Sequence, residues 1–468
     1  MKMATTSQSS QSKTGTTEQL VQFLVDTDYS HLSEAARERA KELVLDFARA
    51  ALGGGTSPLG KIVLDRIKGV GARAEASVIG GKFRTTTAYA AYANAVLDHA
   101  PELEAVGTVG PNISQDIAAV LALGEKLKAP GSKVIESIVV GFEIQARVWN
   151  GAIAAASSRG WVLPFNHVGA VSSACKILDL DVDTARAALG IALGNAGGVN
   201  PQENFSHYLQ LGVPAFSAVQ AAEYAANGVT ANSSMLEAPQ GFCDQFAGQG
   251  GADFSRMTRD LTGASAIVPP GTHIKKYPCC YLAHGAIDAT LELVKDNGIS
   301  YEEIETVEVE VNKATQSMMQ YSKPTNGHEA RFSFEGVLGV AILDRDVWLP
   351  ALTDSSVSSQ RYRDARAKVK VIFHPEWSPG LDAAFHIPVT IRLKNAKVYS
   401  KEVAKPTEPS KDEVIRTYKE LAEPILKMDE IDRSIDMILN LQKVEDIGQL
   451  MNILRAGQDA EERSLAGF

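Results

Sequence analysis

The spacing of apolar residues changes twice along this chain, and these changes constrain its fold more than any other feature. From about residue 18 to residue 268 apolar residues recur at the period of a helix that buries one face. After Pro269-Pro270-Gly271 they alternate with polar residues, as in a half-buried strand, and from residue 411 the helical period returns. The sequence therefore predicts a mainly α fold. A large all-helical domain is expected from residues 18–268 and 411–468, with a smaller α+β domain at 269–410.

The first long helix illustrates how the helical stretches are recognised. Its buried face is a stripe that contains Ala40, Leu43 and Phe47, and Ser33 can cap its N-terminus. The glycine run at 53–55 is predicted to end it, because glycine accepts the left-handed conformation that often follows a helix. The same spacing predicts further helices at 86–99, 115–128, 132–150, 167–179, 182–195, 212–227, 282–297 and 331–344.

Strands are predicted only in the middle of the chain. Val307, Val309 and Val311 alternate with polar residues, which is the period of a strand with one buried face. Similar alternation predicts strands at 368–373, 387–393 and 397–400. The last two are separated by three residues that can form the turn of a hairpin.

Length and charge limit the class of protein. A chain of 468 residues exceeds one ordinary hydrophobic core, which favours two domains. The formal net charge is -10 and no basic stripe with interleaved aromatic residues is present, so no nucleic-acid partner is expected. No apolar run reaches about 18 residues, so no membrane span is expected. In so acidic a protein, the Lys275-Lys276 pair is a candidate for holding an acidic ligand.

Cysteine use and the N-terminal composition bear on the compartment. The four cysteines lack C-x-x-C spacing, so neither a disulfide framework nor a zinc ribbon is indicated. This usage fits a reducing compartment, and a cytoplasmic location is expected, with a mitochondrial one left open. Residues 1–17 are rich in Ser, Thr and Gln and have no apolar core, so a disordered tail is expected there rather than a secretory signal.

One segment concentrates reactive side chains. Lys275, Cys279, Cys280 and His284 lie between a Pro-Pro-Gly turn and an amphipathic helix. A lysine can hold a carboxylate, or act as a base when desolvated, and a histidine can carry a proton near neutral pH. The alternative is that the cysteines and His284 are packing residues of a core, which spacing alone favours for any one of them.

Two more residues have the chemistry of a proton-transfer site. Asp98 ends the alanine-rich helix at 86–99, where its carboxylate can serve as a base or belong to an exposed helix-terminal pair. His167 opens a predicted helix, and a helix N-terminus favours anions and lowers the pKa of a histidine. The alternative for His167 is a helix-capping role.

Other patterns have plain structural explanations. Arg147 lies four residues after Glu143, so a helix ion pair is the first interpretation and a contact with substrate the second. The glycine-rich stretches at 69–71 and 190–198 lack the G-x-G-x-x-G spacing, and no phosphate-binding loop is present. A nucleotide cofactor is therefore not expected.

Several short motifs are shared with a known family. They are Glu42-Leu43-Val44-Leu45-Asp46, Ala95-Val96-Leu97-Asp98, Gly141-Phe142-Glu143, Lys275 through His284, and His328-Glu329-Ala330-Arg331-Phe332-Ser333-Phe334. Over about residues 18–455 the chain resembles the MmgE/PrpD family, which includes 2-methylcitrate dehydratase, cis-aconitate decarboxylase and iminodisuccinate epimerase. The resemblance implies an active site between the two domains, a homodimer, and an activity that needs no metal or organic cofactor.

The resemblance also implies site residues. Those with an expected catalytic role are Asp98, His167, Lys275, His284 and Tyr321. Those expected to bind substrate are Asn112, His207 and Cys280, to which the helix pattern adds Arg147 as a second interpretation.

Departures from the family mark the chain as a divergent member. Ala100 and Pro101 stand where the family has further aspartates, and Gly110-Pro111 stands where it has a His-Pro pair. His207 stands where the family has a lysine. These changes leave room for a different substrate or a different reaction.

The expected function is proton transfer next to a carboxylate of a small di- or tricarboxylic acid. Such a reaction generates enolate-like charge, which Lys275 can stabilise, while His167 and His284 are candidate acid and base. Elimination, decarboxylation and epimerisation all remain open. These residues are expected to converge with Asp98 on one cleft. The alternative is a family-fold protein that has lost catalysis and acts as a binding or interaction protein.

Overall fold

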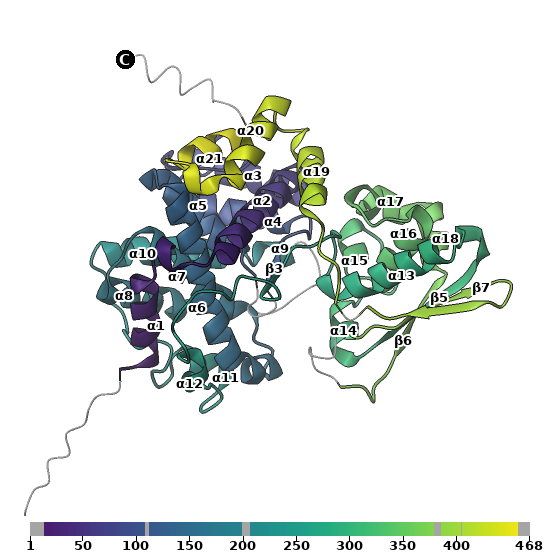
Figure 1. Cartoon of the computed structure of the whole chain (residues 1–468), viewed down its shortest axis with the longest axis horizontal. Helices are drawn as coiled ribbons and strands as arrows, with labels where there is room; N and C mark the ends of the chain where they lie inside the picture. Colours follow the sequence, from purple (N-terminus) through teal and green to yellow (C-terminus); the bar gives the residue numbers. More distant parts are fainter. Residues whose placement is uncertain (1–13, 108–111, 199–205, 379–384, 404, 457–468) are drawn as a thin grey trace, which may run out of the picture.

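The computed structural model describes residues 14–107, 112–198, 206–378, 385–403 and 405–456, and it confirms the mainly α fold class. A larger helical part and a smaller part with a sheet lie side by side, joined near α19 (Lys411–Ala422) (Figure 1). Each part has its own hydrophobic core. Among the described residues, no helix combines the length and the apolar character needed to cross a membrane.

The helical part contains helices from the first half of the chain and from its C-terminal end. They are α1 (Thr16–Asp26), α2 (Glu34–Thr56), α3 (Pro58–Lys68), α4 (Thr87–His99), α5 (Ser114–Leu127), α6 (Gly131–Ser158), α7 (Asn166–Ile177), α8 (Val182–Gly194), α9 (Ser206–Leu209), α10 (Gly212–Ala226), α11 (Phe242–Ala247), α12 (Phe254–Met257), α19, α20 (Met428–Leu439) and α21 (Gly448–Leu454). Most predicted helices match within about two residues, but α6 continues eight residues beyond its predicted end at 150.

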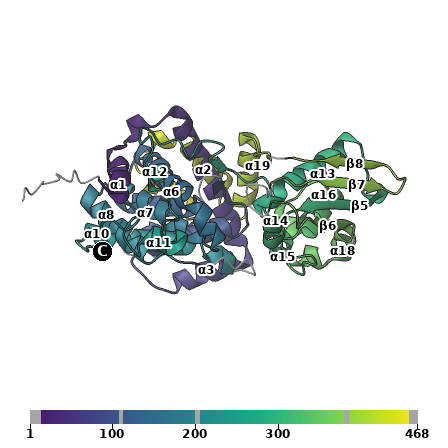
Figure 2. The same ribbon diagram turned by 90° about the horizontal axis from the view of Figure 1, so that it is seen from below.

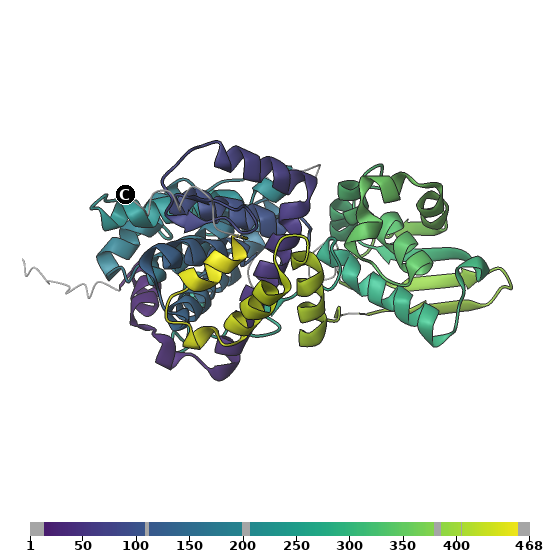
Figure 3. The same ribbon diagram turned by 90° about the horizontal axis from the view of Figure 1, so that it is seen from above.

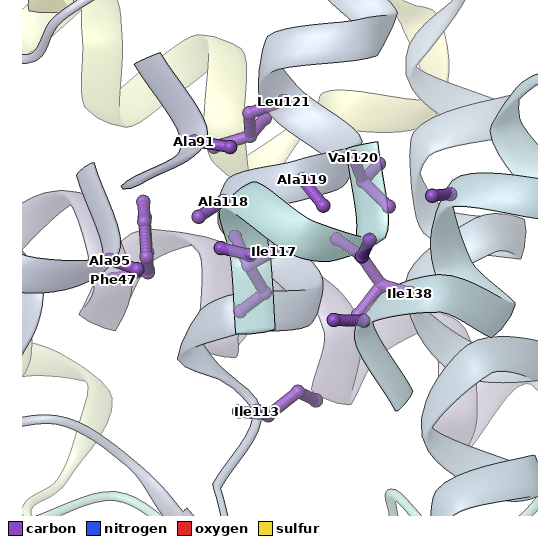
Figure 4. Close-up of a cluster of buried hydrophobic side chains, with 14 of the residues drawn as sticks. Phe47, Ala91, Ala95, Ile113, Ile117, Ala118, Ala119, Val120, Leu121 and Ile138 are labelled. Carbon is purple, nitrogen blue, oxygen red and sulfur yellow. The ribbon is translucent and has the colours of Figure 1, made fainter. Parts of the chain in front are cut away.

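Helix α5 lies at the centre of this part. Ile117, Val120 and Leu121 are fully or almost fully buried, and they lie near side chains of α2, α4 and α6 (Figure 4). Phe47 of α2 and Ala95 of α4 belong to the same cluster. Alanine is frequent on α4 and α5, and its small side chain lets neighbouring helix axes approach closely while still burying apolar surface.

The glycine run at 53–55 does not end α2, which corrects the sequence prediction. The helix continues to Thr56, and Ser57 is its C-terminal cap. A Cβ on Gly54 would lie 1.8 Å from the Leu97 carbonyl oxygen of α4. Gly54 therefore serves close helix–helix packing rather than a left-handed turn.

The smaller part is an α+β unit. Its strands are β5 (Ile304–Val311), β6 (Val369–Phe373), β7 (Val389–Leu393) and β8 (Val398–Lys401), in the order β6-β5-β7-β8. Its helices are α13 (His284–Asp296), α14 (Lys313–Met318), α15 (Gly327–Arg331), α16 (Phe334–Asp344), α17 (Asp354–Ser358) and α18 (Gln360–Arg366). Strands β5 and β6 are parallel, and the other pairs are antiparallel.

The sheet of this unit has one buried face. Val307, Val309 and Val311 of β5 are fully buried, whereas Glu308 and Glu310 between them are partly exposed. Helices α13 and α16 lie along the sheet (Figure 2). The predicted alternation is thus explained by helices that cover only one side.

The three C-terminal helices return to the helical part. Helices α19 and α20 pack on α2, and α21 packs on α5 (Figure 3). Their apolar residues, such as Tyr418, Ile438 and Leu450, belong to the larger core. We propose that the two cores are two domains, the larger one built from both ends of the chain. The chain passes from one core to the other between Ile274 and Tyr277, a few residues after the predicted boundary at 269.

The predicted disordered tail at residues 1–17 overlaps the start of α1. Residues 1–13 lie outside the described residues, as do 457–468. Helix α1 begins at Thr16, and Thr17 is buried, with its backbone N–H donating to Glu237 Oε2 at 3.1 Å. Thr16 and Thr17 therefore belong to the folded helical part.

Two pairs of very short strands complete the helical part. Strand β1 (Ala76–Ser77) pairs with β2 (Arg84–Thr85), and β3 (Val106–Gly107) pairs with β4 (Thr272–His273). The second pair matters for function, because it ties the segment after α4 to the segment that leads into the smaller core. Val106 lies opposite His273, two residues before Lys275.

Candidate active site

A small cavity of about 170 Å³ lies where the two cores meet. It is lined by His99, Glu102, Glu104, Val106, Asn112, Leu163, His207, Gln210, Leu211, Lys275, Cys280, Tyr281, Leu282, Met318 and Phe332. A larger hollow of about 960 Å³ beside α1 is lined by Glu18, Asp26 and His31 but by no lysine or arginine among the described residues. The volume suits a small ligand rather than a dinucleotide.

The lining is assembled by the end of α4 and by the β3–β4 pair. Helix α4 ends at His99, and the chain then turns sharply at Glu102, which has a φ of 57°. Leu103 points into the core, so Glu102 and Glu104 on either side of it face the same way. Pairing of β3 with β4 brings this segment next to Lys275.

Lys275 is the centre of the polar cluster. Its Nζ donates to Glu102 Oε1 at 2.9 Å, to Glu104 Oε1 at 2.8 Å and to the Glu102 carbonyl oxygen at 3.3 Å. All three side chains are nearly inaccessible to solvent. Burial by itself would lower the pKa of Lys275, but the two neighbouring carboxylates outweigh it and raise the pKa above its usual value. Lys275 is therefore a permanent cation in this site.

The two glutamates respond differently to the same surroundings. Burial opposes ionisation of both, but Lys275 and the nearby His99 lower the pKa of Glu102 below its usual range. For Glu104 burial dominates, and the charge on Glu102 adds to it, so the pKa of Glu104 is raised. The two carboxyls form one coupled pair, of which Glu102 is the ionised member.

Two imidazoles lie on the other side of Glu102. His99 Nε2 is 3.6 Å from Glu102 Oε2 and 3.6 Å from Glu104 Oε1, and His207 Nε2 is 3.7 Å from Glu102 Oε2. The two rings meet edge to face at 4.7 Å. Burial lowers the pKa of both histidines, so both are neutral near pH 7.

Two carboxylate oxygens of this cluster lack a hydrogen bond. Glu102 Oε2 and Glu104 Oε2 are buried, and neither has a hydrogen-bond partner within the part of the chain that the structure describes. Buried polar atoms are rarely left in this state, because the lost hydration costs about 1–3 kcal/mol or more. Such atoms mark a place where a ligand, water or ion binds.

Four of the expected site residues line the cavity, namely Asn112, His207, Lys275 and Cys280. The carbonyl of Asn112 accepts hydrogen bonds from the side chains of Gln115 and Gln145, each at 2.7 Å, which fixes the chain at this point. The backbone N–H of Cys280 donates to the Arg331 carbonyl at 3.0 Å. Hydrogen bonds to their main-chain groups therefore fix the positions of Asn112 and Cys280.

Asp98 lies beside the cavity rather than in its lining. It is 1% exposed, and burial raises the pKa of its carboxyl well above the usual value, with Ser114 opposing the shift. Charges on Glu104 and Lys275 also act on it. Asp98 is thus electrostatically connected to the cluster but does not line the space for a ligand.

The two expected catalytic histidines are also outside the lining. His284 opens α13 behind Lys275, with its ring 5.2 Å from that of Tyr277, and burial lowers its pKa. His167 lies at the start of α7, and burial lowers its pKa to about 4. Its neighbour Asn166 accepts a hydrogen bond from the backbone N–H of Asn112 at 3.4 Å. Convergence on one cleft is therefore partial.

Tyr321 and Arg147 have other surroundings. The Tyr321 ring is 6.3 Å from that of His328, and its backbone N–H donates to the Phe332 carbonyl, next to the cavity but not in its lining. Arg147 contacts Glu143 at 2.8 Å and donates to the carbonyls of Arg259 and Asp260. This ion pair is the first interpretation of the sequence pattern, and Arg147 is not among the described residues that line the cavity.

His99, Glu102 and Glu104 were not predicted from the sequence as cavity residues. Ala100 and Pro101, which stand where the family has aspartates, carry no carboxylate. A signal was present one to three residues further on, in two glutamates that flank a leucine directly after an alanine-rich helix. This segment thus still offers two carboxyl groups, and both contact Lys275.

Comparison with known proteins identifies the family. The MmgE/PrpD N-terminal domain matches residues 18–255, and the MmgE/PrpD C-terminal domain matches residues 277–443. The chain belongs to the MmgE/PrpD family. The resemblance seen in the motifs is thereby confirmed. The second match extends beyond residue 411, although α19 and α20 contribute to the larger core.

Several curated relatives of this MmgE/PrpD protein are distant but match nearly its whole length. Human cis-aconitate decarboxylase is 24% identical over 458 residues, which cover 93% of each chain. Cis-aconitate decarboxylase of Aspergillus terreus is 24% identical over 486 residues, with 97% and 98% of the two chains covered. The mouse protein of the same name is also 24% identical, over 460 residues. The sequence similarity thus extends over nearly the whole chain, at an identity that leaves the reaction open.

Proposed function

We propose that this protein is an enzyme that transfers a proton at the carbon next to a carboxylate of a small di- or tricarboxylic acid. The observation that carries the proposal is the cluster around Lys275, in which one ammonium, two carboxyls and two imidazoles face a small cavity between the cores. Family membership and the distant similarity to cis-aconitate decarboxylase support a lyase, and an isomerase uses the same first step.

Lys275 has the role of stabilising negative charge on the substrate. Removing a proton next to a carboxylate places charge on its oxygens, and a fixed cation in a water-poor site lowers the energy of that state. The longest of its three hydrogen bonds, to the Glu102 carbonyl, is the one most easily exchanged for a substrate oxygen. The bonds to Glu102 Oε1 and Glu104 Oε1 then hold the ammonium in place.

His99, His207 and Glu104 are the proposed proton carriers. Each lines the cavity, and imidazole and carboxyl groups are the side chains that most often move protons in enzymes. If the substrate carries a leaving group, the result is elimination; if a carboxylate departs, it is decarboxylation; if the proton returns to the opposite face, it is epimerisation. Asp98 and His284 are proposed as positioning residues for this cluster, and His167 and Tyr321 as residues that support its edge.

A second candidate function is a family-fold binding protein without catalysis. One specific observation favours it: every N–H of the Lys275 ammonium already has an acceptor within the protein. A substrate carboxylate must therefore displace a bond that the folded protein already makes. The two candidates differ in whether a bound carboxylic acid exchanges protons with solvent.

The test is solvent isotope exchange with a panel of acids. Citrate, 2-methylcitrate, cis-aconitate and amino-dicarboxylates are incubated with the protein in deuterium oxide, and NMR follows deuterium entering the substrate. We expect exchange with at least one acid, and His207→Gln should slow it markedly. His374→Ala, at a partly exposed histidine outside the cavity, is the matched control. Binding without exchange would favour the second candidate, and neither binding nor exchange would contradict both.

A homodimer and a cytoplasmic location complete the proposal. All four cysteines are free and buried, which fits a reducing compartment. The oligomeric state can be measured by light scattering coupled to size-exclusion chromatography, where a mass twice that of the 50.1 kDa chain is expected. A monomeric mass would contradict the proposed dimer but would not bear on the proposed proton transfer.

A further inference from the structure

Three side chains of the cavity are arranged as a set of metal ligands. His99 Nε2, His207 Nε2 and Glu102 Oε2 all lie within 4.8 Å of one another, and Glu102 Oε2 is 3.6 Å and 3.7 Å from the two nitrogens. Ions such as Zn²⁺ bind histidine and carboxylate ligands at about 2.0–2.2 Å, so such ligands lie roughly 3–3.6 Å apart. Small side-chain rotations would bring these three atoms to that spacing.

The free oxygen of Glu102 points independently to a ligand. Glu102 is 4% exposed, and its Oε2 has no hydrogen-bond partner in the described part of the chain, although two imidazole nitrogens face it. Its other oxygen accepts from Lys275 at 2.9 Å, which fixes the plane of the carboxylate. Metal-binding carboxylates are commonly oriented in this way by a hydrogen bond to the oxygen that does not bind the ion.

Charge gives a further reason for a cation. The cavity must accept an anionic substrate according to the proposed function, yet among the described lining residues the Lys275 ammonium is already matched by the Glu102 carboxylate. A divalent ion would make the lining net positive and supply a second positive centre for a substrate carboxylate. The ion would thus supply positive charge that this chain lacks, because His207 stands where the family has a lysine and the histidine of the family's His-Pro pair is absent from the sequence.

We propose that His99, His207 and Glu102 bind a divalent transition-metal ion of the Zn²⁺, Mn²⁺ or Fe²⁺ class at the wall of this cavity. Two nitrogen donors and one carboxylate favour these ions over Mg²⁺ and Ca²⁺, which prefer sites made of oxygen alone. Glu104, with Oε1 at 3.6 Å from His99 Nε2, is placed to orient or complete the site. The use of the ion in substrate binding rests on the proposed function, in which Glu104 is then the remaining proton carrier because His99 and His207 hold the ion; binding of the ion does not rest on it.

Metal binding can be measured without any substrate. The full-length protein is treated with a chelator and then titrated with Zn²⁺, Mn²⁺, Co²⁺ and Mg²⁺ by calorimetry. We expect one equivalent of each transition-metal ion to bind and Mg²⁺ to bind weakly. The visible absorption of bound Co²⁺ should indicate nitrogen and oxygen ligands. No stoichiometric transition-metal binding by the parent protein would overturn the proposal.

Variants separate this site from adventitious binding at the surface. His207→Ala should lower Zn²⁺ affinity by more than the roughly 10–100-fold that loss of an outer hydrogen-bond partner costs. His374 forms a partly exposed cluster with Glu310 and Glu376 at 2.7 and 2.8 Å, so His374→Ala tests loose surface binding and should leave the affinity unchanged. Equal affinities in the parent protein and in folded His207→Ala would contradict the assignment.

Lys275→Met gives a test with the opposite sign. Lys275→Met removes a positive charge that repels a divalent ion, and we expect this gain to outweigh the lost hydrogen bond to Glu102 Oε1, so metal affinity should rise. Bound Zn²⁺ should then recover part of the thermal stability that this variant loses. A buried ion-pair cluster with no metal would lose stability without such recovery. Isotope exchange measured before and after chelation then separates the two proposals, because exchange without metal supports the proton-transfer function alone.

Discussion

The middle of helix α4 and its C-terminal end differ sharply, although they belong to one helix. In the middle, Ala91 and Ala95 pack in a dry core beside α2 and α5, where small side chains leave no room for a ligand (Figure 4). At the end, His99 and the segment after it present polar atoms to a cavity, and two of the carboxylate oxygens have no hydrogen-bond partner in the described residues. The first region is optimised for packing, whereas the second retains polar groups that folding alone does not satisfy. In α4, the candidate site begins where close packing of alanines ends, at His99.

The largest expected effect on stability concerns Lys275, whose ammonium contacts the segment directly after α4. Lys275→Met should lower the free energy of unfolding by about 3–5 kcal/mol, because it leaves buried carboxylates without their partner. Urea unfolding at pH 7 in the presence of a chelator measures it. The neighbouring Lys276 is half-buried and lies 5.5 Å from the Tyr277 ring, so Lys276→Met should change stability by less than about 1 kcal/mol. Equal losses in both variants would show that Lys275 contributes no more than an ordinary lysine.

The next effect tests the dry contact between α2 and α4. Gly54→Ala should destabilise the protein by about 1–3 kcal/mol or more, because the new Cβ would overlap the Leu97 carbonyl. Thermal unfolding of this variant and of Gly55→Ala gives a matched pair. At Gly55 the nearest atom to a Cβ is a side-chain carbon of Ile425 at 3.8 Å, and a helical Gly→Ala change there should stabilise by about 0.5–1 kcal/mol. A neutral Gly54→Ala would contradict the close packing.

A third prediction uses the buried carboxylate of Asp116 on α5, which forms no ion pair with the residues that the structure describes. Burial raises the pKa of Asp116 well above its usual value, with Gln115 donating to it at 3.0 Å and Gln145 and Gly169 alongside. A raised folded-state pKa means that Asp116 favours folding most at low pH. This contribution falls by at most about 1.4 kcal/mol per pH unit as pH rises from about 4 to the folded pKa.

Asp116→Asn removes this ionisation while keeping the shape of the side chain. We expect the variant to gain stability relative to the parent protein as pH rises from 5 to 8, measured by urea unfolding at each pH. Asp183→Asn on the exposed start of α8 is the control and should show no such trend. A parallel pH dependence in parent and Asp116→Asn would mean that the Asp116 carboxylate is stabilised by groups other than those named.

The smallest effect concerns Arg147, which does not line the cavity among the described residues. Arg147→Gln should leave isotope exchange within about twofold of the parent rate, because the guanidinium binds Glu143 and two backbone carbonyls. The loss in stability should be about 1 kcal/mol, typical for a partly buried ion pair with hydrogen bonds. A large fall in exchange rate with unchanged stability would restore Arg147 as a substrate contact.

Some features of the site were predictable and others were not. Lys275, Cys280, Asn112 and His207 were found because motifs and family positions mark them in the sequence. His99, Glu102 and Glu104 were not, because their role depends on a turn at Glu102 and on the pairing of β3 with β4. Asp98 precedes His99 in the sequence, and the charge of Lys275 acts on both Asp98 and His284. Neither property places a side chain in the lining of the cavity.

The sequence alone determined most of the long helices, the four strands of the larger sheet, and the family to which the chain belongs. The helical and strand periods of apolar residues are visible in short stretches of sequence, so they can be recognised without knowing what covers each face. Only the tertiary structure decided that Gly54 separates two helices rather than ending one, and that Lys275 meets two glutamates more than 170 residues earlier in the chain. The physical reason is the same in both cases: the outcome depends on what a distant segment brings into contact, and a local pattern does not contain that partner.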